Sequence, residues 1–522
     1  MKYLSLISAF ILCCLCSYAQ LKTDAQSESF KEKKSLSIKK VLLLKDGNTF
    51  YLSLSKKTMA VRIYNANHSL KTIQESKAPA GKGSAFRIIG MYEMNKDITM
   101  LLSTIVDHQI ILKRLIFDGS TGILKEETKI DEMLKIPSIA NIGLGFNVPE
   151  PNFFSEAMPE GNGYAIATMN SFEQDRSKRL YVTVYGLDNT LLSRAYFKTT
   201  DERYKYIRYI GLLPLEKSKL GIAAYGYNTR SSGDKECALL FGTLIAGENH
   251  LTVAELQSSL APPHYSLVKY NPKSNKIMLL TKEYLADITA SIIDPVKNSI
   301  FTKPLMPDKT TNKKSYNDRA LRLENVFAND DGNFTIAYEH FWHHLIVGTP
   351  GSQGSSRHFR LDYTLSTLSV DKLTELESYT IPKRWEVPNN SINSLDVPHA
   401  AIDLELAYKH MSAMESFNFL EANGKKYFFL NETPENIARG QAEKSLKIRR
   451  SLQECDAYVF TLSGNKKVPP AKPFFSRSAI GIDNLGMFKT YDYDSLKNKY
   501  VVVKAEQLGK KKSWRIVWMT PS

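Results

Sequence analysis

The sequence contains few cysteines. Of the five, Cys13, Cys14 and Cys16 lie near the N-terminus, so only Cys237 and Cys455 remain in the rest of the 522-residue chain. Two cysteines cannot form a disulfide framework, and the stability of a chain this long must come from its apolar core. The two form either one disulfide or two buried thiols. Both adjoin strand-like apolar runs, which favours buried thiols.

Long apolar runs are also scarce. The clear one lies in residues 1–19, where Lys2 precedes an apolar core that ends in the small residues Ser17 and Ala19. This order is typical of a secretory signal peptide cut after Ala19; the alternative is a buried N-terminal strand or helix. We therefore expect export to the periplasm, the cell surface or the extracellular space. No later run approaches the ~20 apolar residues that cross a bilayer, so we expect no transmembrane segment in the mature chain, residues 20–522.

Motifs for phosphate binding and nucleophilic catalysis are absent. The Gly-rich stretches 80–84 and 348–356 lack the Gly-Lys-Ser/Thr of a phosphate-binding loop. No stretch has the G-x-S-x-G context of a serine nucleophile. These absences disfavour an enzyme relative to a binding protein, and we expect no cofactor.

Acidic residues are fewer than basic ones, 54 against 69, which gives a formal net charge of +15. Basic clusters lie at 31–40, 447–450 and 509–512. They either attract acidic polymers, such as lipopolysaccharide, acidic glycans or nucleic acid, or are solvated turns and edge-strand lysines. Because the clusters are dispersed and no nucleic-acid-binding motif accompanies them, we favour the second interpretation and expect no nucleic-acid partner.

Strand signals fill most of the chain. Short runs rich in Val, Ile, Leu, Tyr and Phe flank tight polar turns, as in 41–54, 91–103 and 419–432. An apolar run on each side of such a turn is the pattern of a β-hairpin. Turns of this kind recur eight times, at Asp46, Asn95, Gly161, Lys217, Ser274, Asp331, Asn423 and Lys497.

The recurring unit is one of four antiparallel strands, which is typical of propeller blades. We therefore predict an all-β fold: a β-propeller of seven or eight four-stranded antiparallel blades, with few or no helices outside the signal peptide. The alternative is two smaller β-sandwich domains. The last unit stops after three strands, and residues 35–40 could supply the fourth and close the ring. The mature chain would then be one domain.

Three insertions interrupt the repeat, around 340–358, 383–418 and 433–453. The third contains the one helix-like stretch, 435–453, interrupted by Gly440.

One part of the chain resembles a known group. The stretch 330–383 contains DDGNFTIAYEHFWHH, RHFRLDYTLSTL and SYTIPK, and KKYFFLNETPEN follows at 425–436. These segments resemble secreted bacterial β-propeller-like proteins of uncharacterised function. Glu339, the Ile-Pro-Lys at 381–383 and Asn431 carry the resemblance, which implies no activity.

The sequence departs from that group at His340, His343 and His344. With Glu339 they form the densest ionisable cluster, but on a strand Glu339 and His343 lie on one face and His340 and His344 on the other. No His-x-His pair and no HExxH motif exists here, so we predict no metal site. The cluster is either a strand end with solvated or packed imidazoles, or the wall of a pocket at the propeller mouth.

The insertion at 383–405 carries Trp385, Asp396, His399, Asp403 and Glu405. Carboxylates near a histidine can perform acid–base chemistry, but long loops on a rigid scaffold more often bind. We therefore assign no catalytic residue. The binding candidates are Glu339, Trp342, His343, Arg357, Trp385 and His399.

The sequence thus favours an exported, monomeric binding or scaffold protein that presents loops on one rim of a β-propeller to an unknown protein or glycan partner. Two alternatives stay open. One is a carbohydrate-active hydrolase or lyase on the same scaffold, which would need two or more carboxylates converging near the central channel. The other is a structural envelope protein, which would show a wide apolar patch.

Overall fold

The computed structural model describes most of the chain in sixteen segments. They are residues 21–32, 37–79, 86–135, 148–199, 203–216, 218–228, 236–259, 263, 265–282, 288–305, 319–346, 355–387, 417–464, 467–476, 481–509 and 511–522. The predicted signal peptide, residues 1–19, and the candidate His399 lie outside them.

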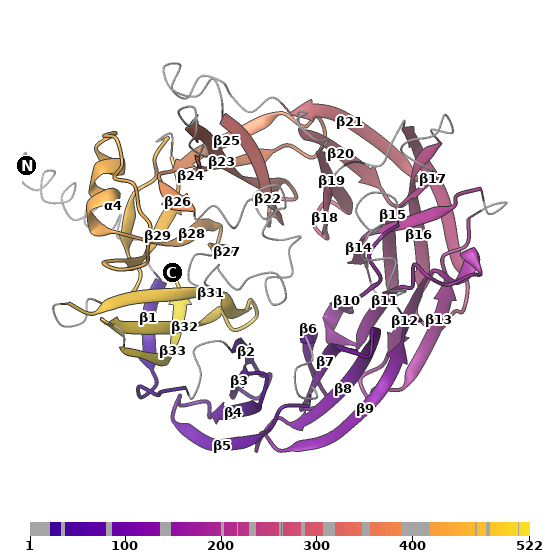
Figure 1. The fold of residues 1–522 in the computed structure, drawn as a ribbon, viewed down its shortest axis with the longest axis horizontal. Coiled ribbons are helices and arrows are strands. Elements are labelled where there is room, and N and C mark those ends of the chain that lie inside the picture. Colours follow the sequence, from indigo (N-terminus) through magenta and orange to yellow (C-terminus); the bar gives the residue numbers. More distant parts are fainter. Residues whose placement is uncertain are drawn as a thin grey trace, which may run out of the picture.

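The described strands form eight antiparallel sheets arranged around a ring (Figure 1). Blade 1 consists of β2 (Ile38–Leu43), β3 (Thr49–Leu54), β4 (Thr58–Tyr64) and β5 (Leu70–Lys77), and blade 2 of β6 (Phe86–Met94), β7 (Asp97–Val106), β8 (Gln109–Asp118) and β9 (Leu124–Glu132). Blade 3 consists of β10 (Asn152–Ala157), β11 (Tyr164–Met169), β12 (Leu180–Tyr185) and β13 (Leu191–Tyr196), and blade 4 of β14 (Tyr206–Pro214), β15 (Lys219–Tyr227), β16 (Cys237–Ile245) and β17 (Leu251–Ser259).

Blades 5 to 8 complete the ring. Blade 5 consists of β18 (Tyr265–Asn271), β19 (Lys276–Lys282), β20 (Ile288–Asp294) and β21 (Ser299–Leu305). Blade 6 consists of β22 (Arg319–Ala328), β23 (Phe334–Ile346), β24 (Ser355–Leu368) and β25 (Glu375–Ile381), with β26 (Trp385–Val387) paired to β24. Blade 7 consists of β27 (Asn418–Ala422), β28 (Lys425–Glu432), β29 (Asp456–Leu462) and β30 (Ala471–Pro473), and blade 8 of β31 (Asp483–Asp494), β32 (Lys499–Leu508), β33 (Lys511–Pro521) and β1 (Leu21–Gln26). The prediction of a propeller is confirmed, with eight blades.

Each blade packs against the next through an apolar layer. Eight clusters of buried side chains fill the boundaries between neighbouring blades. A strand in the middle of a blade is therefore covered on both faces: all six residues of β11 are buried. An outer strand such as β5 is mostly exposed. This burial explains why the central strands are continuous apolar runs and the outer strands are charged.

Seven of the eight predicted turns lie in the described segments, and each joins the first and second strands of a blade. The eighth, Lys217, lies outside the described residues. In blade 7 the turn is Asn423–Gly424, and both residues have positive φ, 53° and 69°. A two-residue hairpin turn of this kind matches the right-handed twist of its strands, and Asn-Gly adopts it at low cost. These turns could therefore be predicted from the local sequence.

The ring closes through a different segment from the one predicted. Residues 38–43 form the first strand of blade 1, whereas β1 supplies the fourth strand of blade 8. Leu21 pairs with Pro521 at one end of β1, and Val517 pairs with Gln26 at the other. The prediction of 35–40 was wrong because that segment leads directly into the hairpin turn at Asp46 and is needed within its own blade.

The two faces of the ring differ. Since consecutive strands alternate in direction, the connections from first to second and from third to fourth strand lie on one face, which we call the turn face. The remaining connections lie on the opposite face, which we call the loop face. The strand ends at 346, 381 and 432 all lie on the loop face. The insertions predicted around 383–418 and 433–453 follow two of these ends. The one predicted around 340–358 begins inside β23, because residues 340–346 and 355–358 belong to β23 and β24.

The insertion in blade 7 contains α4 (Pro434–Gln441), the helix expected in that region. Thr433 accepts a hydrogen bond from the Asn436 backbone amide at 3.2 Å, which caps the first turn. A Cβ on Gly440 would lie 2.4 Å from Cγ of Pro382, so only glycine allows α4 to approach the end of blade 6 this closely. No helix within the described segments is long and apolar enough to cross a membrane.

No disulfide joins the two remaining cysteines. Cys237 lies in β16 of blade 4 and Cys455 precedes β29 of blade 7, and both are buried. The prediction of two buried thiols is confirmed. Burial raises the pKa of the Cys455 thiol, which keeps it in the unreactive protonated form.

Candidate functional site

Blade 6 extends beyond its neighbours on the loop face. Its strands β23 and β24 have 13 and 14 residues and are the longest described. The extended part of β24 pairs with β26, and Trp385 of β26 forms a parallel bridge with Arg449 of the blade 7 insertion. We call this assembly, the loop-face ends of β23 and β24 with β26 and the segment at Arg449, the rim sheet.

One row of side chains crosses the inner side of the rim sheet. Phe341 pairs with Arg360, Arg360 with Trp385, and Trp385 with Arg449. The Arg449 guanidinium lies 4.7 Å from the centroid of the Trp385 ring, a cation–π contact. The Glu386 amide donates to the Arg449 carbonyl at 2.7 Å. These contacts join the insertions of blades 6 and 7.

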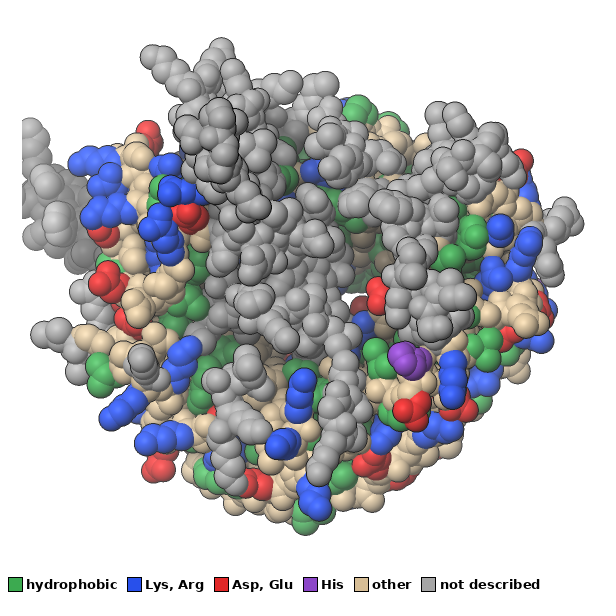
Figure 2. Space-filling view, viewed as in Figure 1, with side chains coloured by type: hydrophobic (Ala, Val, Ile, Leu, Met, Phe, Trp, Pro, Cys, Tyr) green, Lys and Arg blue, Asp and Glu red, His purple; other side chains and the backbone are tan. Residues whose placement is uncertain are grey.

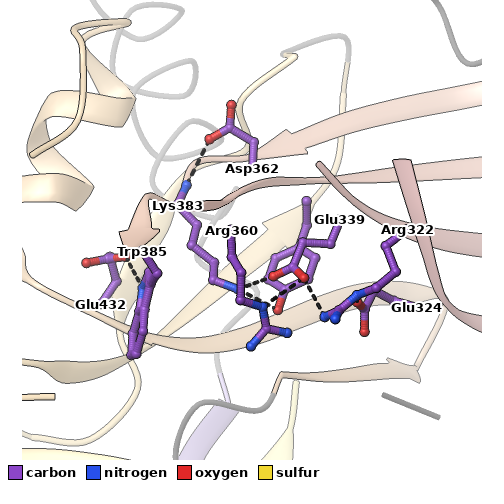
Figure 3. Close-up of polar contacts among 9 residues, drawn as sticks. Arg322, Glu324, Glu339, Arg360, Asp362, Lys383, Trp385 and Glu432 are labelled. Carbon is purple, nitrogen blue, oxygen red and sulfur yellow. Dashed lines mark hydrogen bonds and ion pairs between the residues drawn. The ribbon is translucent and has the colours of Figure 1, made fainter. Parts of the chain in front are cut away.

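A buried ionic cluster shares Arg360 with this row (Figure 3). The Glu339 carboxylate accepts from Arg322 Nη2 at 2.5 Å, from Arg360 Nε at 3.0 Å and from Lys383 Nζ. Arg322 also pairs with Glu324. Lys383 Nζ donates to the Tyr363 hydroxyl at 2.9 Å. Glu339 and Glu324 are wholly inaccessible to solvent, and we call these residues the Glu339 cluster.

Cations outnumber carboxylates in the Glu339 cluster, and the pKa values reflect this. Burial alone would raise the pKa of Glu339, but Arg360, Lys383 and Arg322 lower it to about 2. Burial lowers the pKa of Lys383 to about 8; Glu339 opposes this shift, and Arg360 adds to it. Glu339 is therefore ionised at every physiological pH, whereas Lys383 begins to lose its proton just above neutrality.

The lowered pKa of Lys383 predicts that the folded protein becomes more stable as the pH rises above about 8. The folded pKa of Lys383, about 8, lies below the ordinary value of 10.5, so between these values the unfolded chain binds a proton that the folded chain does not. Stability from this group therefore rises with pH across that window, by up to about 3 kcal/mol. Urea unfolding of the protein and of Lys383→Met at pH 7.5, 9 and 10 measures it. The difference between the two should grow in favour of the unaltered protein; parallel profiles would contradict the assignment.

A second buried carboxylate fixes the other end of the rim sheet. Glu432, at the end of β28, accepts from Trp385 Nε1 at 3.2 Å, Arg449 Nη1 at 2.9 Å and Asn436 Nδ2 at 3.2 Å. Since Asn436 belongs to α4, this one carboxylate holds β26, the Arg449 segment and the helix together.

The six binding candidates have different positions. Glu339 lies inside the ionic cluster, Trp385 is buried against Arg449, and Trp342 is half-buried and stacks on Phe359 with ring centroids 5.1 Å apart. Arg357 is half exposed and pairs with Glu386 at 3.6 Å.

The backbone of His343 pairs with His358 across β23 and β24, and its side chain lies outside the described residues, as does all of His399. The structure thus brings Glu339, Trp342, Arg357 and Trp385 to the rim sheet, on both of its sides.

Sequence reasoning missed the partners of Glu339. Arg322 and Glu324 lie in the run RALRLENVF, and Arg360 lies in RHFRLDY. Charges at alternate positions of an otherwise apolar strand are the available signal, because a charge that faces a core needs a buried partner. Among the described residues, no three His, Cys, Asp or Glu side chains gather as metal ligands would.

No model of a protein family matches the sequence, and no curated protein is similar to it in sequence. Among solved structures, the chain is similar to prolyl oligopeptidase B from Galerina marginata, with 8% identity and a TM-score of 0.41 over 94% of this chain and 56% of that chain. It is also similar to an oligogalacturonate lyase in complex with manganese, with 8% identity and a TM-score of 0.38 over 95% and 98% of the two chains.

A third similar structure is the polysaccharide lyase Uly1, with 9% identity and a TM-score of 0.39 over 86% of this chain and 91% of that one. The chain spans little more than half the length of the prolyl oligopeptidase B structure.

Proposed function

We propose that the chain is an exported binding protein that presents the outer side of the rim sheet to a protein or glycan partner. The observation that carries this proposal is the joining of two blade insertions into one supported sheet. Two buried carboxylates, Glu339 and Glu432, hold its inner side through contacts to five cationic or aromatic side chains of other strands or segments. A surface that is ordered before binding loses less conformational entropy on binding.

The outer side of the rim sheet carries charged side chains beside the stacked pair Trp342 and Phe359. Side chains alternate along a strand, so Arg357, Glu386 and Arg450 lie opposite the inner row. The Glu386 carboxylate lies 3.6 Å from Arg357 Nε and 2.8 Å from Arg450 Nε. The arginine side chains are 50% and 68% exposed, and both can bind an acidic or hydroxyl-rich partner. Figure 2 shows further Lys and Arg side chains gathered over α4 and its surroundings.

The geometry of the Glu339 cluster disfavours the hydrolase alternative. That alternative requires carboxylates that converge near the central channel; Glu324 and Glu339 both pair with Arg322, but both are sealed from solvent and paired with cations. A general acid needs a pKa near the working pH, and Glu339 has a pKa of about 2. The cluster therefore supports the rim sheet and does not reach a substrate.

A pull-down with residues 20–522 from envelope and host-surface extracts tests the proposal. The variant Arg357→Glu/Arg450→Glu should recover at least about tenfold less partner, because it reverses two exposed charges without altering the inner row. The matched control, Lys273→Glu/Lys297→Glu, makes the same charge change in exposed turns of the turn face. A partner that both variants recover equally would place the binding surface elsewhere, and no partner in any extract would overturn the proposal.

A further inference from the structure

A small cavity of about 140 Å³ lies on the loop face between blades 3 and 4, away from the rim sheet. Its apolar lining is Phe197, Tyr204 and Ile207, all buried. The polar lining comes from two connections. Arg176 and Ser177 belong to the one between β11 and β12, and Lys198 and Thr199 to the one between β13 and β14.

The two cations that line this cavity, Arg176 and Lys198, differ from the nearby cations in their contacts. Nearby, Lys178 pairs with Asp175 at 3.1 Å, and Arg203 pairs with Glu236 at 3.0 Å. Arg179 donates to the carbonyls of Glu173 and Lys205, each at 2.7 Å. Within the described part of the chain, the side chains of Arg176 and Lys198 have no such partner, and the cavity lining contains no carboxylate.

We propose that this cavity binds a small organic carboxylate, either as a free acid or as one acidic unit of a glycan. Arg176 and Lys198 supply the positive charge, and the Thr199 hydroxyl supplies a polar contact at the same wall. The Ser177 hydroxyl donates to Asp175 at 2.7 Å and is not counted among the ligand contacts. The buried aromatic and aliphatic lining suits the carbon skeleton of such a ligand.

The size of the cavity limits the ligand. At about 30 Å³ per water molecule, its volume corresponds to about four or five waters. Pockets that enclose drug-sized ligands have about 300–1,000 Å³, so an oligosaccharide or a peptide could place only one unit here. The site does not depend on the partner of the rim sheet, and either proposal can fail without the other.

Ligand-observed saturation-transfer NMR at low salt tests the site with three probes. D-glucuronate carries the carboxylate, D-glucose is its neutral counterpart, and methyl D-glucuronide keeps the carboxylate but blocks the anomeric hydroxyl as a glycan does. We expect glucuronate to bind and glucose not to bind. Equal binding of the methyl glycoside would identify a glycan unit as an acceptable ligand, and its loss would restrict the site to free acids.

The variant Arg176→Ala/Lys198→Ala should weaken glucuronate binding at least about tenfold, and 0.5 M NaCl should weaken it in the unaltered protein. Lys178→Ala, in the same connection but paired with Asp175, is the matched control and should bind normally. Circular dichroism and melting temperature check that each variant folds. Glucuronate binding weaker than about 50 mM, binding that survives the double variant, or equal binding of glucose would overturn the proposal.

Discussion

Replacing Glu339 with glutamine should lower the free energy of unfolding by about 3–5 kcal/mol, the usual cost of removing one partner from a buried ion pair. Glutamine keeps the size of the side chain but removes the charge that Arg322, Arg360 and Lys383 share. These three cations are almost fully buried and cannot turn to solvent without opening the blade. Urea unfolding at pH 7 measures the effect.

The matched control is Glu377→Gln in β25 of the same blade. Glu377 pairs with Lys426 at 3.4 Å, but its side chain is 47% exposed. An exposed pair contributes at most about 1 kcal/mol, so this variant should unfold close to the unaltered protein. Equal effects of the two substitutions would show that the Glu339 cluster is not the charge network described above.

Removal of β1 should have an effect of similar or greater size. A chain that begins at Ser27 loses the fourth strand of blade 8 and the five residue pairs that β1 makes with β33. It also loses the ion pair between Asp24 and Lys499 at 2.6 Å. At about 1 kcal/mol per hydrogen bond, the loss is on the order of 5 kcal/mol. The exposed edge of β33 should in addition pair with other copies of the chain.

Thermal unfolding and light scattering of residues 27–522 against 20–522 measure both effects. A synthetic peptide of residues 21–30, added in trans, should restore the melting temperature by adding the missing strand to the open edge. A scrambled peptide of the same composition serves as the control. Unchanged melting of the shorter chain, or rescue by the scrambled peptide, would contradict closure of the ring by β1.

The repeat was predictable because hairpins are local. A turn such as Asn423–Gly424 and the apolar runs beside it lie within one short stretch, and their pattern reflects backbone conformation and strand alternation. Eight such turns at related spacings were sufficient for a propeller of seven or eight blades. The two buried thiols and the helix near Gly440 could also be predicted, since each depends on residues close to it in sequence.

The segment that closes the ring could not be predicted from local sequence in the same way. The segment at 35–40 and the strand β1 both precede the first turn, and both contain alternating apolar and polar residues. Only the position of the free edge of β33, which pairs Leu21 with Pro521, distinguishes them. That edge exists only after the other strands have been arranged in the ring.

The sequence by itself determined the fold class and the blade repeat. The tertiary structure alone decided what the charged residues of blade 6 do. Glu339 and Trp385 looked like surface residues of a binding loop, yet they lie on the buried side of the rim sheet. The reason is physical: whether a charge faces solvent or a core depends on strand register and on partners such as Lys383 and Arg449, which are distant in sequence and adjacent only in the folded ring.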